Sequence, residues 1–222
     1  FIRIMSKDEL VLYTIYRSSA AWRVRIALNL KELSYESRVV EWKSEKGYNK
    51  SELLKINPAG RIPVFVHNGR VLTESLAIVE YIEETFPGPK LLPSDPFKRH
   101  QARAIALHIT AGIQPLQIGR TTEKVEEMAG EGKGAEWAAY WLHRGLAELE
   151  EMVAKTAGKY AVGDDVTIAD ICIPSILNNA RRWKADISAF PTLLKIDENL
   201  DAIPEFAAAH ANKQPDSGGA SF

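Results

Sequence analysis

The sequence predicts an α/β domain followed by an all-helical domain. Strand and helix patterns alternate over the first ninety residues, and two apolar runs flank Asn68-Gly69, which is a strong hairpin signal. Four prolines and a glycine within residues 86–96 indicate a linker. Beyond the linker, strand patterns are scarce and apolar residues recur at helical spacing. We therefore expect domains at residues 1–90 and 97–222.

The first domain is expected to be a small mixed sheet with helices on its faces. Its expected elements, in order, are a strand at 10–16, a helix at 22–33, a strand at 35–41, a helix at 51–56, the Asn68-Gly69 hairpin and a helix from Ser75. Two strands joined by a helix imply a parallel, right-handed unit. The short helix ends before Asn57-Pro58 because the residue before a proline disfavours the helical conformation.

The second domain is expected to contain only helices. They are predicted from Pro96 to 113, over 137–155, from Thr167, and from Thr192 into AIPEFAAAHAN. Thr167 and Asp170 have capping-box spacing, so we interpret Asp170 as structural. The C-terminal QPDSGGASF is small and polar and is expected to fray. No internal repeat is recognisable.

The composition is that of an ordinary globular protein. Of the 222 residues, 45% are hydrophobic and 26% charged, and the formal charge is -1. This balance argues against a nucleic-acid-binding protein held by a general phosphate field, but it allows a local basic pocket. No apolar run reaches membrane-spanning length, and the N-terminus lacks a signal-peptide pattern. We expect a cytoplasmic protein that does not insert into membranes.

Reactive side chains outside the first helix give weaker signals. The single cysteine, Cys172, excludes a disulfide within the chain and is expected to be a buried thiol. The five histidines show no metal-ligand spacing, so no metal is expected, and the five tryptophans are interpreted as core. Met5 resembles a natural start, so residues 1–4 are expected to be extraneous and residues 1–8 loosely held.

Two adjacent serines stand where the first strand meets the first helix, in YRSSAAWRVRIAL. Either hydroxyl can cap the helix, but both cannot, which leaves one for a ligand. A ligand thiol at this point would meet a hydroxyl donor and the positive end of a helix. A hydrogen bond to a charged group contributes about 1.5–3 kcal/mol, enough to lower a thiol pKa by roughly one or two units.

Longer motifs resemble, in order along the chain, those of the zeta class of glutathione transferases. They are RSSAAWRVRIAL, NPAGRIPV, ESLAIVEYIEETFP, LLPSDPFKRHQAR, AGIQPLQ, VGDDVTIADICI and HANKQPD. The serine–arginine signature with AGIQPLQ is specific to the class, whereas ES-x-AI marks only the superfamily. The chain departs from the pattern at Ala20, where the family has cysteine, at residues 118–120, and in much of 42–51.

This resemblance implies a thioredoxin-like domain that binds glutathione and a helical domain that contributes the substrate pocket. The implied reaction is the isomerisation of maleylacetoacetate to fumarylacetoacetate in tyrosine and phenylalanine breakdown, by reversible addition of the glutathione thiolate to the double bond. A dicarboxylate substrate and a homodimer are also implied. Conjugation or dehalogenation of small α-halo acids is the alternative activity. A non-catalytic glutathione-binding protein is a further alternative, which Ala20 keeps open.

The resemblance also assigns roles to residues. Ser18 is expected to activate the thiol, with Ser19 as the helix cap or helper. The expected glutathione site comprises Ser18, Ser19, Ala20, Arg23, Asn49, Ile62, Pro63, Glu74, Ser75 and Gln114, with a cis Ile62–Pro63 bond and a helix kink at Pro115. Arg182 and Arg23 are expected to bind the substrate carboxylates, with Arg181 as an alternative to Arg182. Without the resemblance, Arg23, Arg25, Arg181 and Arg182 would be interpreted as solvated or salt-bridged surface residues.

Overall fold

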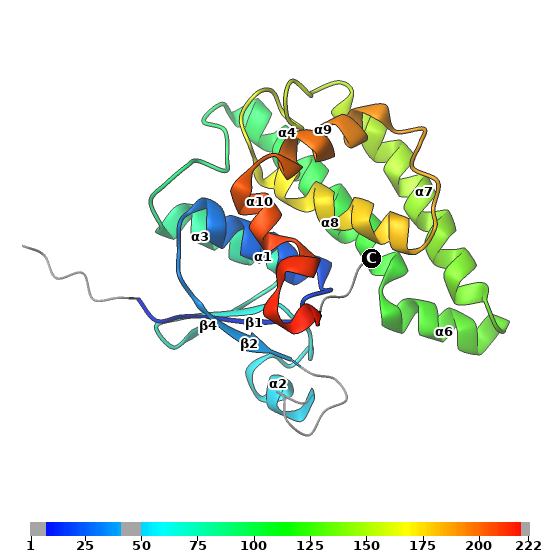
Figure 1. Ribbon diagram of the computed structural model, residues 1–222, viewed down its shortest axis with the longest axis horizontal. Helices are drawn as coiled ribbons and strands as arrows, with labels where there is room; N and C mark the ends of the chain where they lie inside the picture. Colours follow the sequence, from blue (N-terminus) through cyan, green and yellow to red (C-terminus); the bar gives the residue numbers. More distant parts are fainter. Residues whose placement is uncertain (1–7, 41–49, 219–222) are drawn as a thin grey trace, which may run out of the picture. The chain divides into compact units, whose positions relative to one another are not determined.

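The computed structural model describes residues 8–40 and 50–218 and divides into two compact units. The first unit contains the described residues up to Gly88 and returns to include 208–218, and the second is Pro89–Ala207 (Figure 1). The boundary after Gly88 lies in the predicted linker. The prediction that all residues after 97 belong to the helical domain is wrong, because the C-terminal segment packs with the first unit.

The first unit is built on a four-stranded mixed sheet. Its strands are β1 (Leu10–Thr14), β2 (Glu36–Val39), β3 (Val64–His67) and β4 (Arg70–Thr73), in the spatial order β2-β1-β3-β4. The β1–β2 pair is parallel and the other pairs are antiparallel, as predicted. Asn68 and Gly69 both have positive φ, 50° and 78°, which two-residue hairpin turns of this kind require.

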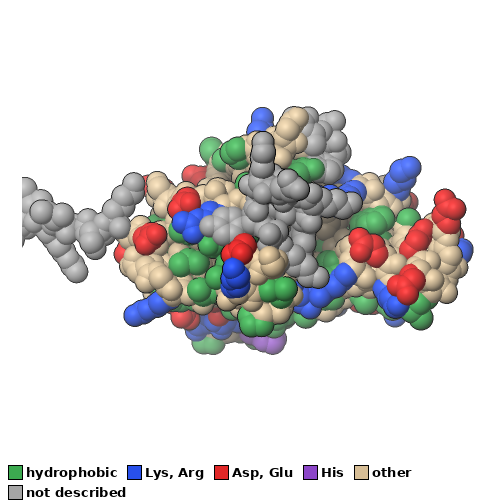
Figure 2. Space-filling model, turned by 90° about the horizontal axis from the view of Figure 1, so that it is seen from below, with side chains coloured by type: hydrophobic (Ala, Val, Ile, Leu, Met, Phe, Trp, Pro, Cys, Tyr) green, Lys and Arg blue, Asp and Glu red, His purple; other side chains and the backbone are tan. Residues whose placement is uncertain are grey.

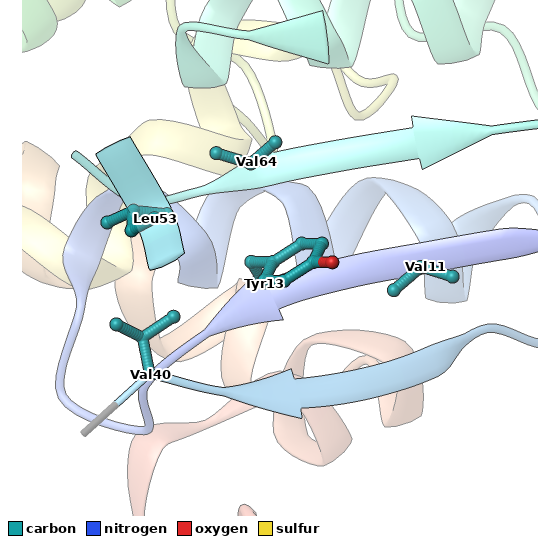
Figure 3. Packing of buried hydrophobic residues seen from close by; sticks show 5 residues of the cluster. All are labelled: Val11, Tyr13, Val40, Leu53 and Val64. Atoms are coloured by element: carbon teal, nitrogen blue, oxygen red, sulfur yellow. The ribbon is translucent and has the colours of Figure 1, made fainter. Parts of the chain in front are cut away.

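Three helices accompany the sheet, namely α1 (Ser19–Leu30), α2 (Lys50–Ile56) and α3 (Ser75–Thr85). Side chains alternate along β1, so Val11 and Tyr13 face one side of the sheet. They pack there with Leu53 of α2, together with Val40 and Val64 (Figure 3). α1 and α3 pack against each other and are joined by a buried ion pair, in which Lys31 Nζ lies 2.6 Å from Glu83 Oε2.

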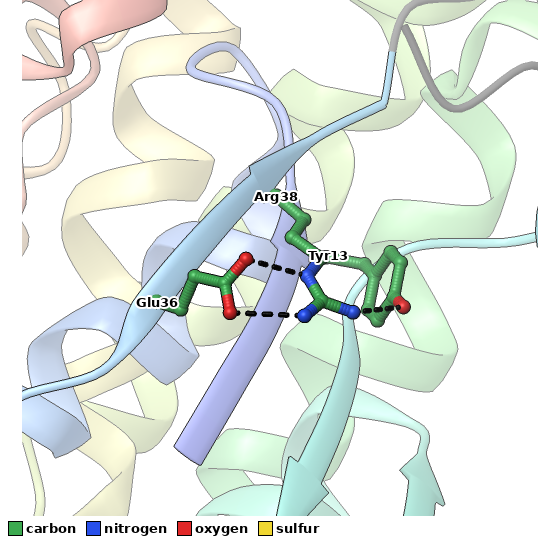
Figure 4. A network of polar contacts seen from close by, with 3 residues as sticks. All are labelled: Tyr13, Glu36 and Arg38. Atoms are coloured by element: carbon green, nitrogen blue, oxygen red, sulfur yellow. Dashed lines mark hydrogen bonds and ion pairs between the residues drawn. The ribbon is translucent and has the colours of Figure 1, made fainter. Parts of the chain in front are cut away.

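A polar contact also fixes the register of the parallel pair. Tyr13 and Arg38 are direct partners across β1 and β2. Arg38 donates from Nη1 to the Tyr13 hydroxyl at 2.9 Å and makes a two-pronged ion pair with Glu36 at 2.7 and 2.9 Å (Figure 4). Such cross-strand pairs stabilise one register over its neighbours.

The second unit is helical, as predicted. It contains α4 (Pro96–Leu107), η1 (His108–Ile113), α5 (Gln114–Gln117), α6 (Gly119–Ala129), α7 (Lys133–Val153), α8 (Ile168–Arg182), α9 (Pro191–Asp201) and the start of α10 (Pro204–Ala209). The helix predicted from Thr192 is in fact two helices, α9 and α10. α6 was not predicted, because GRTTEKVEEMA offers few apolar residues at helical spacing.

The predicted capping box at the start of α8 is confirmed. The Thr167 hydroxyl accepts the N–H of Ala169 at 3.3 Å. The Asp170 carboxylate accepts from Ala161 N–H at 2.8 Å and from Thr167 N–H and Oγ1 at 2.8 and 2.9 Å. Asp170 is fully buried, and burial raises its pKa to about 6 although these hydrogen bonds act in the opposite direction. Cys172 on the same helix is buried, as expected.

Several surface features differ from the sequence predictions. Trp137 is 36% exposed rather than core. Asp8, expected in a loose end, accepts a hydrogen bond from Asn68 Nδ2 at 2.9 Å.

Figure 2 shows basic and acidic side chains together on one face of the molecule. Over residues 8–40 and 50–218, no helix is both long and apolar enough to cross a bilayer, and no group of His, Cys, Asp and Glu is arranged to hold a metal ion.

The Asp170 carboxyl gives a pH dependence whose sign can be tested. Its pKa is about 6 in the folded chain, against an ordinary value of 3.8. The folded state therefore binds more protons between these values, and the free energy of unfolding falls as pH rises. From pH 5 to pH 7 this group alone should lower that free energy by about 1 kcal/mol. Urea unfolding of the parent chain and Asp170→Asn at both pH values isolates the effect. An equal difference between the two proteins at both pH values would contradict it.

Candidate active site

Three loops leave the sheet of the first unit at the same edge. Tyr13, Val64 and Thr73 form one row across β1, β3 and β4. Because β1 and β4 end at this row while β3 begins there, the residues just beyond it must lie along one edge. These residues are the segment leading to Ser18, the Ile62–Pro63 pair and the Glu74–Ser75 pair. The topology therefore brings together three of the motifs that the sequence singled out.

Ser18 lies at the N-terminus of α1. Its backbone is extended (φ -75°, ψ 111°), and its Oγ accepts the N–H of Ala21 at 3.2 Å. Ser18 is therefore the helix cap, and the expectation that Ser19 is the cap is wrong. Ser19 is the first residue of the helix and is buried, and α1 begins three residues earlier than predicted. Both serines fit the sequence preference for caps, so the backbone angles decide between them.

Capping leaves the Ser18 hydroxyl able to donate. A hydroxyl has two lone pairs and one proton, so it can accept from Ala21 and donate to a ligand at once. The first turn of α1 contains no acidic residue, and Arg23 and Arg25 follow in the same helix. The helix dipole at this N-terminus favours a negative charge in front of Ser18, and the two cations add to this effect.

The Ile62–Pro63 peptide bond is cis, as the resemblance implied. The loop before it is fixed by Asn57, whose Oδ1 accepts the N–H of Ala59 at 3.0 Å and whose Nδ2 donates to the carbonyl of Arg61 at 2.8 Å. Among the described residues, neither backbone polar group of Ile62 has a hydrogen-bond partner. This segment can therefore pair with an extended peptide in the manner of an added strand.

Glu74 and Ser75 lie at the start of α3. Glu74 is exposed, has φ of 66° and makes no capping hydrogen bond through its side chain within the described residues. A positive φ at a non-glycine residue costs free energy and persists where the surroundings enforce it, frequently at functional sites. Ser75 is buried, and its Oγ accepts from Arg23 Nη1 at 3.2 Å. Arg23 thereby ties α1 to the N-terminus of α3.

The interpretation of Arg23 and Arg25 as surface residues is wrong. Each is only 1% exposed. Arg25 donates to the carbonyls of Ala209, Ile15 and Tyr16 and to the Thr14 hydroxyl, at 3.0–3.4 Å. With so little surface, Arg23 is placed to hold Ser75 rather than to meet a substrate carboxylate directly. Sequence reasoning missed both roles because the partners lie 9 to 184 positions away.

Three expected site residues belong to the second unit. Gln114 is half-buried and begins α5, after the π-helix η1; its N–H donates to the carbonyl of Ile109, five residues back. The π-helical segment thus ends directly before Pro115, which cannot donate to the preceding turn, while the kink expected at Pro115 stays a prediction. π-helical turns are frequent at functional sites.

The two candidate substrate arginines have different surroundings. Arg181 Nη2 lies 2.8 Å from Asp197 Oδ2, and Asp197 is 5% exposed. Burial raises the pKa of Asp197, and Arg181 opposes that shift. Arg182 is exposed and its guanidinium lies 5.6 Å from the centre of the Trp183 ring. Arg181 therefore compensates a buried carboxylate, while Arg182 presents its charge at the surface of its unit.

The remaining expected residues complete the set. Ala20 is half-buried in the first turn of α1, beside the two serines. Pro63 is buried and Ile62 is half-buried, and both lie immediately before β3. Asn49 lies outside the described residues. Asn57 was not singled out as a supporting residue, although asparagine before Pro-x-Gly is a recognised turn signal.

The capping role of Ser18 predicts a separable effect on stability. Ser18→Ala should lower the free energy of unfolding by about 1 kcal/mol, because Ala21 N–H loses its acceptor. Ser18→Asp should retain most of that stability, since a carboxylate also caps and suits the positive helix end. Urea unfolding at pH 7 measures both. Equal losses in the two variants would contradict the capping role.

Comparison with known proteins agrees with this arrangement. The glutathione S-transferase N-terminal domain family matches residues 12–90, and the C-terminal domain family matches 120–213. A probable maleylacetoacetate isomerase of Caenorhabditis elegans is 49% identical over 214 residues, covering 96% of this chain and 99% of that protein.

Solved structures show the same fold. A crystal structure of maleylacetoacetate isomerase from Anaeromyxobacter dehalogenans 2CP-1 has glutathione in its active site. It is 40% identical with a TM-score of 0.86, covering 95% of this chain and 99% of that one. Another structure of that enzyme holds dicarboxyethyl glutathione and citrate. A bacterial zeta-class maleylpyruvate isomerase is 32% identical with a TM-score of 0.87, covering 94% and 100%. The chain belongs to the glutathione S-transferase family and, within it, to the zeta class.

Proposed function

We propose that this chain is a glutathione-dependent cis–trans isomerase that converts maleylacetoacetate to fumarylacetoacetate, a step of tyrosine and phenylalanine breakdown. The observation that carries the proposal is the Ser18 hydroxyl at the N-terminus of α1, on the edge shared with Ile62 and Glu74. The activity named for the Caenorhabditis and Anaeromyxobacter proteins supports it.

The residues of this edge fit glutathione group by group. Ser18 offers a hydroxyl donor to a thiol, and Ile62 offers a backbone N–H and C=O to a peptide. The N-terminus of α3 suits a carboxylate, and the exposed Glu74 carboxylate suits an ammonium group. Glutathione carries all four groups along one extended chain, so the site would bind it in a single orientation.

The chain's own contribution to the reaction is electrostatic. Bound glutathione supplies a thiolate that adds reversibly to the cis double bond, which can then rotate as a single bond. The Ser18 hydroxyl and the α1 N-terminus hold the sulfur in its charged form, which a free thiol with pKa near 8.5 adopts only to a few per cent at pH 7. The first-turn N–H groups of α1 also favour the negative charge that develops on the substrate.

The substrate is a dianion, and Arg182 is the residue we assign to one of its carboxylates. Arg182 is exposed and always charged, and a guanidinium binds a carboxylate through two parallel hydrogen bonds. The citrate and the dicarboxyethyl group bound by the Anaeromyxobacter enzyme support a preference for polycarboxylates. Arg181 is the weaker candidate because it already pairs with Asp197.

Assembly and location follow the family resemblance. We expect a homodimer, which light scattering coupled to gel filtration would measure directly. A cytoplasmic location is in keeping with a single cysteine and with no need for a disulfide.

Loss of the Ser18 hydroxyl should lower the isomerase activity even in a variant whose new side chain still caps α1. In Ser18→Ala the pKa of the bound thiol should rise by about one to two units and kcat/KM at pH 7 should fall roughly tenfold to hundredfold. Ser18→Asp should lose as much or more, since a carboxylate cannot donate and repels the thiolate. Ultraviolet absorbance of the thiolate and turnover of maleylacetoacetate report the two quantities.

The same assay separates the alternative functions. Brisk dehalogenation of α-halo acids without isomerase turnover would replace the proposed substrate. Glutathione binding with an unshifted thiol pKa and no turnover would indicate a non-catalytic protein. Isomerase activity unchanged in Ser18→Ala would remove Ser18 from the mechanism.

The two arginines should separate affinity from stability. Arg182→Ala should raise KM for maleylacetoacetate about tenfold with little change in the urea midpoint, since its pairing with one carboxylate is lost. Arg181→Ala should lower the urea midpoint, because Asp197 is left buried without its cation. Steady-state kinetics and urea unfolding of both variants test this. A rise in KM confined to Arg181→Ala would reverse the assignment.

A further inference from the structure

The C-terminal segment 208–218 contacts the loop that carries Ser18. The segment contains η2 (Ala211–Lys213) and η3 (Pro215–Ser217), drawn in red beside α1 in Figure 1. Asp216 Oδ2 accepts the N–H of Tyr16 at 2.8 Å, across 200 positions of sequence. The expectation that this tail frays is therefore wrong for residues 214–218.

Arg25 also contacts this loop. Its Nη2 donates to the carbonyl of Tyr16 at 3.0 Å, while its Nε donates to the carbonyl of Ala209 at 3.2 Å. One guanidinium thus joins the loop to the C-terminal segment. Burial lowers the pKa of Arg25 to about 10, and the nearby Tyr35 and the Asp216 carboxylate oppose that shift.

The two contacts fix both polar groups of one residue. The N–H of Tyr16 is bound to Asp216 and its C=O to Arg25. Ser18 follows two residues later, and its own N–H donates to the carbonyl of Ile15 at 3.0 Å. Residues 15–17 alone separate β1 from Ser18, so the orientation of the Tyr16 peptide units is transmitted directly to the backbone of the cap.

Further contacts hold the segment on α1. The rings of Trp22 and His210 meet edge to face with centroids 4.7 Å apart, and Trp22 is 4% exposed. Within the segment, Gln214 Nε2 donates to the carbonyls of Ala208 and His210, each at 3.0 Å. Asp216 is thus presented from a short, internally bonded turn rather than from a loose tail.

We propose that Asp216 is a positioning residue for Ser18, and that the C-terminal segment 208–218 helps to orient the thiol-activating site. This inference rests on the proposed role of Ser18. A small misorientation of the Ser18 hydroxyl should weaken its hydrogen bond to the thiolate, since misplacements of about 1 Å can cost as much as a hundredfold in rate. Removal of the Asp216 acceptor should therefore change the orientation of residues 16–18, and through it the thiol pKa and the reaction rate.

The test compares Asp216→Ala and Asp216→Asn with the parent protein. Alanine removes the acceptor, whereas asparagine keeps an oxygen that can accept the Tyr16 N–H. In the glutathione-free protein, amide exchange at Tyr16 should be at least about tenfold faster in Asp216→Ala, with Leu12 in β1 unchanged. With glutathione bound, the thiol pKa should rise, and kcat/KM for maleylacetoacetate should fall about threefold to tenfold. Asp216→Asn should stay near the parent in all three measurements.

Lys213→Ala is the matched control, because Lys213 is an exposed residue of the same segment; it should leave all values unchanged. If Asp216→Ala loses its cooperative urea transition, Asp216→Glu, which keeps the charge but displaces the carboxylate, replaces it. Faster exchange with an unshifted thiol pKa and unchanged turnover would overturn the proposal, as would asparagine behaving like alanine. A parent protein without isomerase turnover would instead reject the proposed function, while the exchange rates would still report on the Asp216 contact.

Discussion

The hydrogen bond from Ala21 N–H to Ser18 Oγ is the constraint on which the site depends. It fixes the side chain of Ser18 at the end of α1 and leaves the hydroxyl proton available. A serine in a free loop would rotate and bond to water. A serine inside the helix would turn its hydroxyl toward the preceding carbonyls. Only the capping position combines a fixed oxygen, an available proton and the positive end of the helix dipole.

The helix that Ser18 caps is held by three buried cations, each with a different partner. Arg23 reaches Ser75 at the start of α3, Arg25 reaches the first loop and the C-terminal segment, and Lys31 pairs with Glu83 farther along α3. A buried charge that loses its partners is strongly destabilising, so each of these cations disfavours arrangements of α1 in which its acceptors are out of reach. The position of α1, and with it the direction in which its N-terminus points, is thereby specified at three places along its length.

Much of the fold could be predicted because its signals are local. The signals for the Asn-Gly hairpin and for the Thr167–Asp170 capping box each span only a few residues, and the structure confirms both. In the first unit the order of strands and helices follows from periodicity together with the turn and proline signals. The thioredoxin-like domain and the cis proline required the family resemblance, because spacing and composition do not specify a peptide isomer.

What the sequence could not predict is held by distant partners. Arg23 and Arg25 have the composition of surface residues, and their burial depends on acceptors that are 52 and 184 positions away. The C-terminal segment is polar and small, and its contacts reach residues far away in sequence, such as the Tyr16 N–H that donates to Asp216 and the Arg25 guanidinium that donates to Ala209. Ser18 and Ser19 satisfy the same preference, so the cap is decided by the backbone angles that the β1–α1 loop imposes.

The site residues depend on contacts between segments that are far apart in the sequence. The sheet edge that carries Ser18, Ile62 and Glu74 is formed by four segments, residues 15–18, 57–63, 74–75 and 208–218. This edge therefore forms only when the whole first unit has folded. An isolated N-terminal piece ending at Gly88 would lack Asp216 and the Ala209 carbonyl, and Arg25 would keep only its acceptors in residues 14–16. In such a piece α1 could still form, but the Tyr16 N–H would lose its Asp216 acceptor. If Ser18 has the proposed role, thiol activation depends on the completed first unit, which includes residues 208–218.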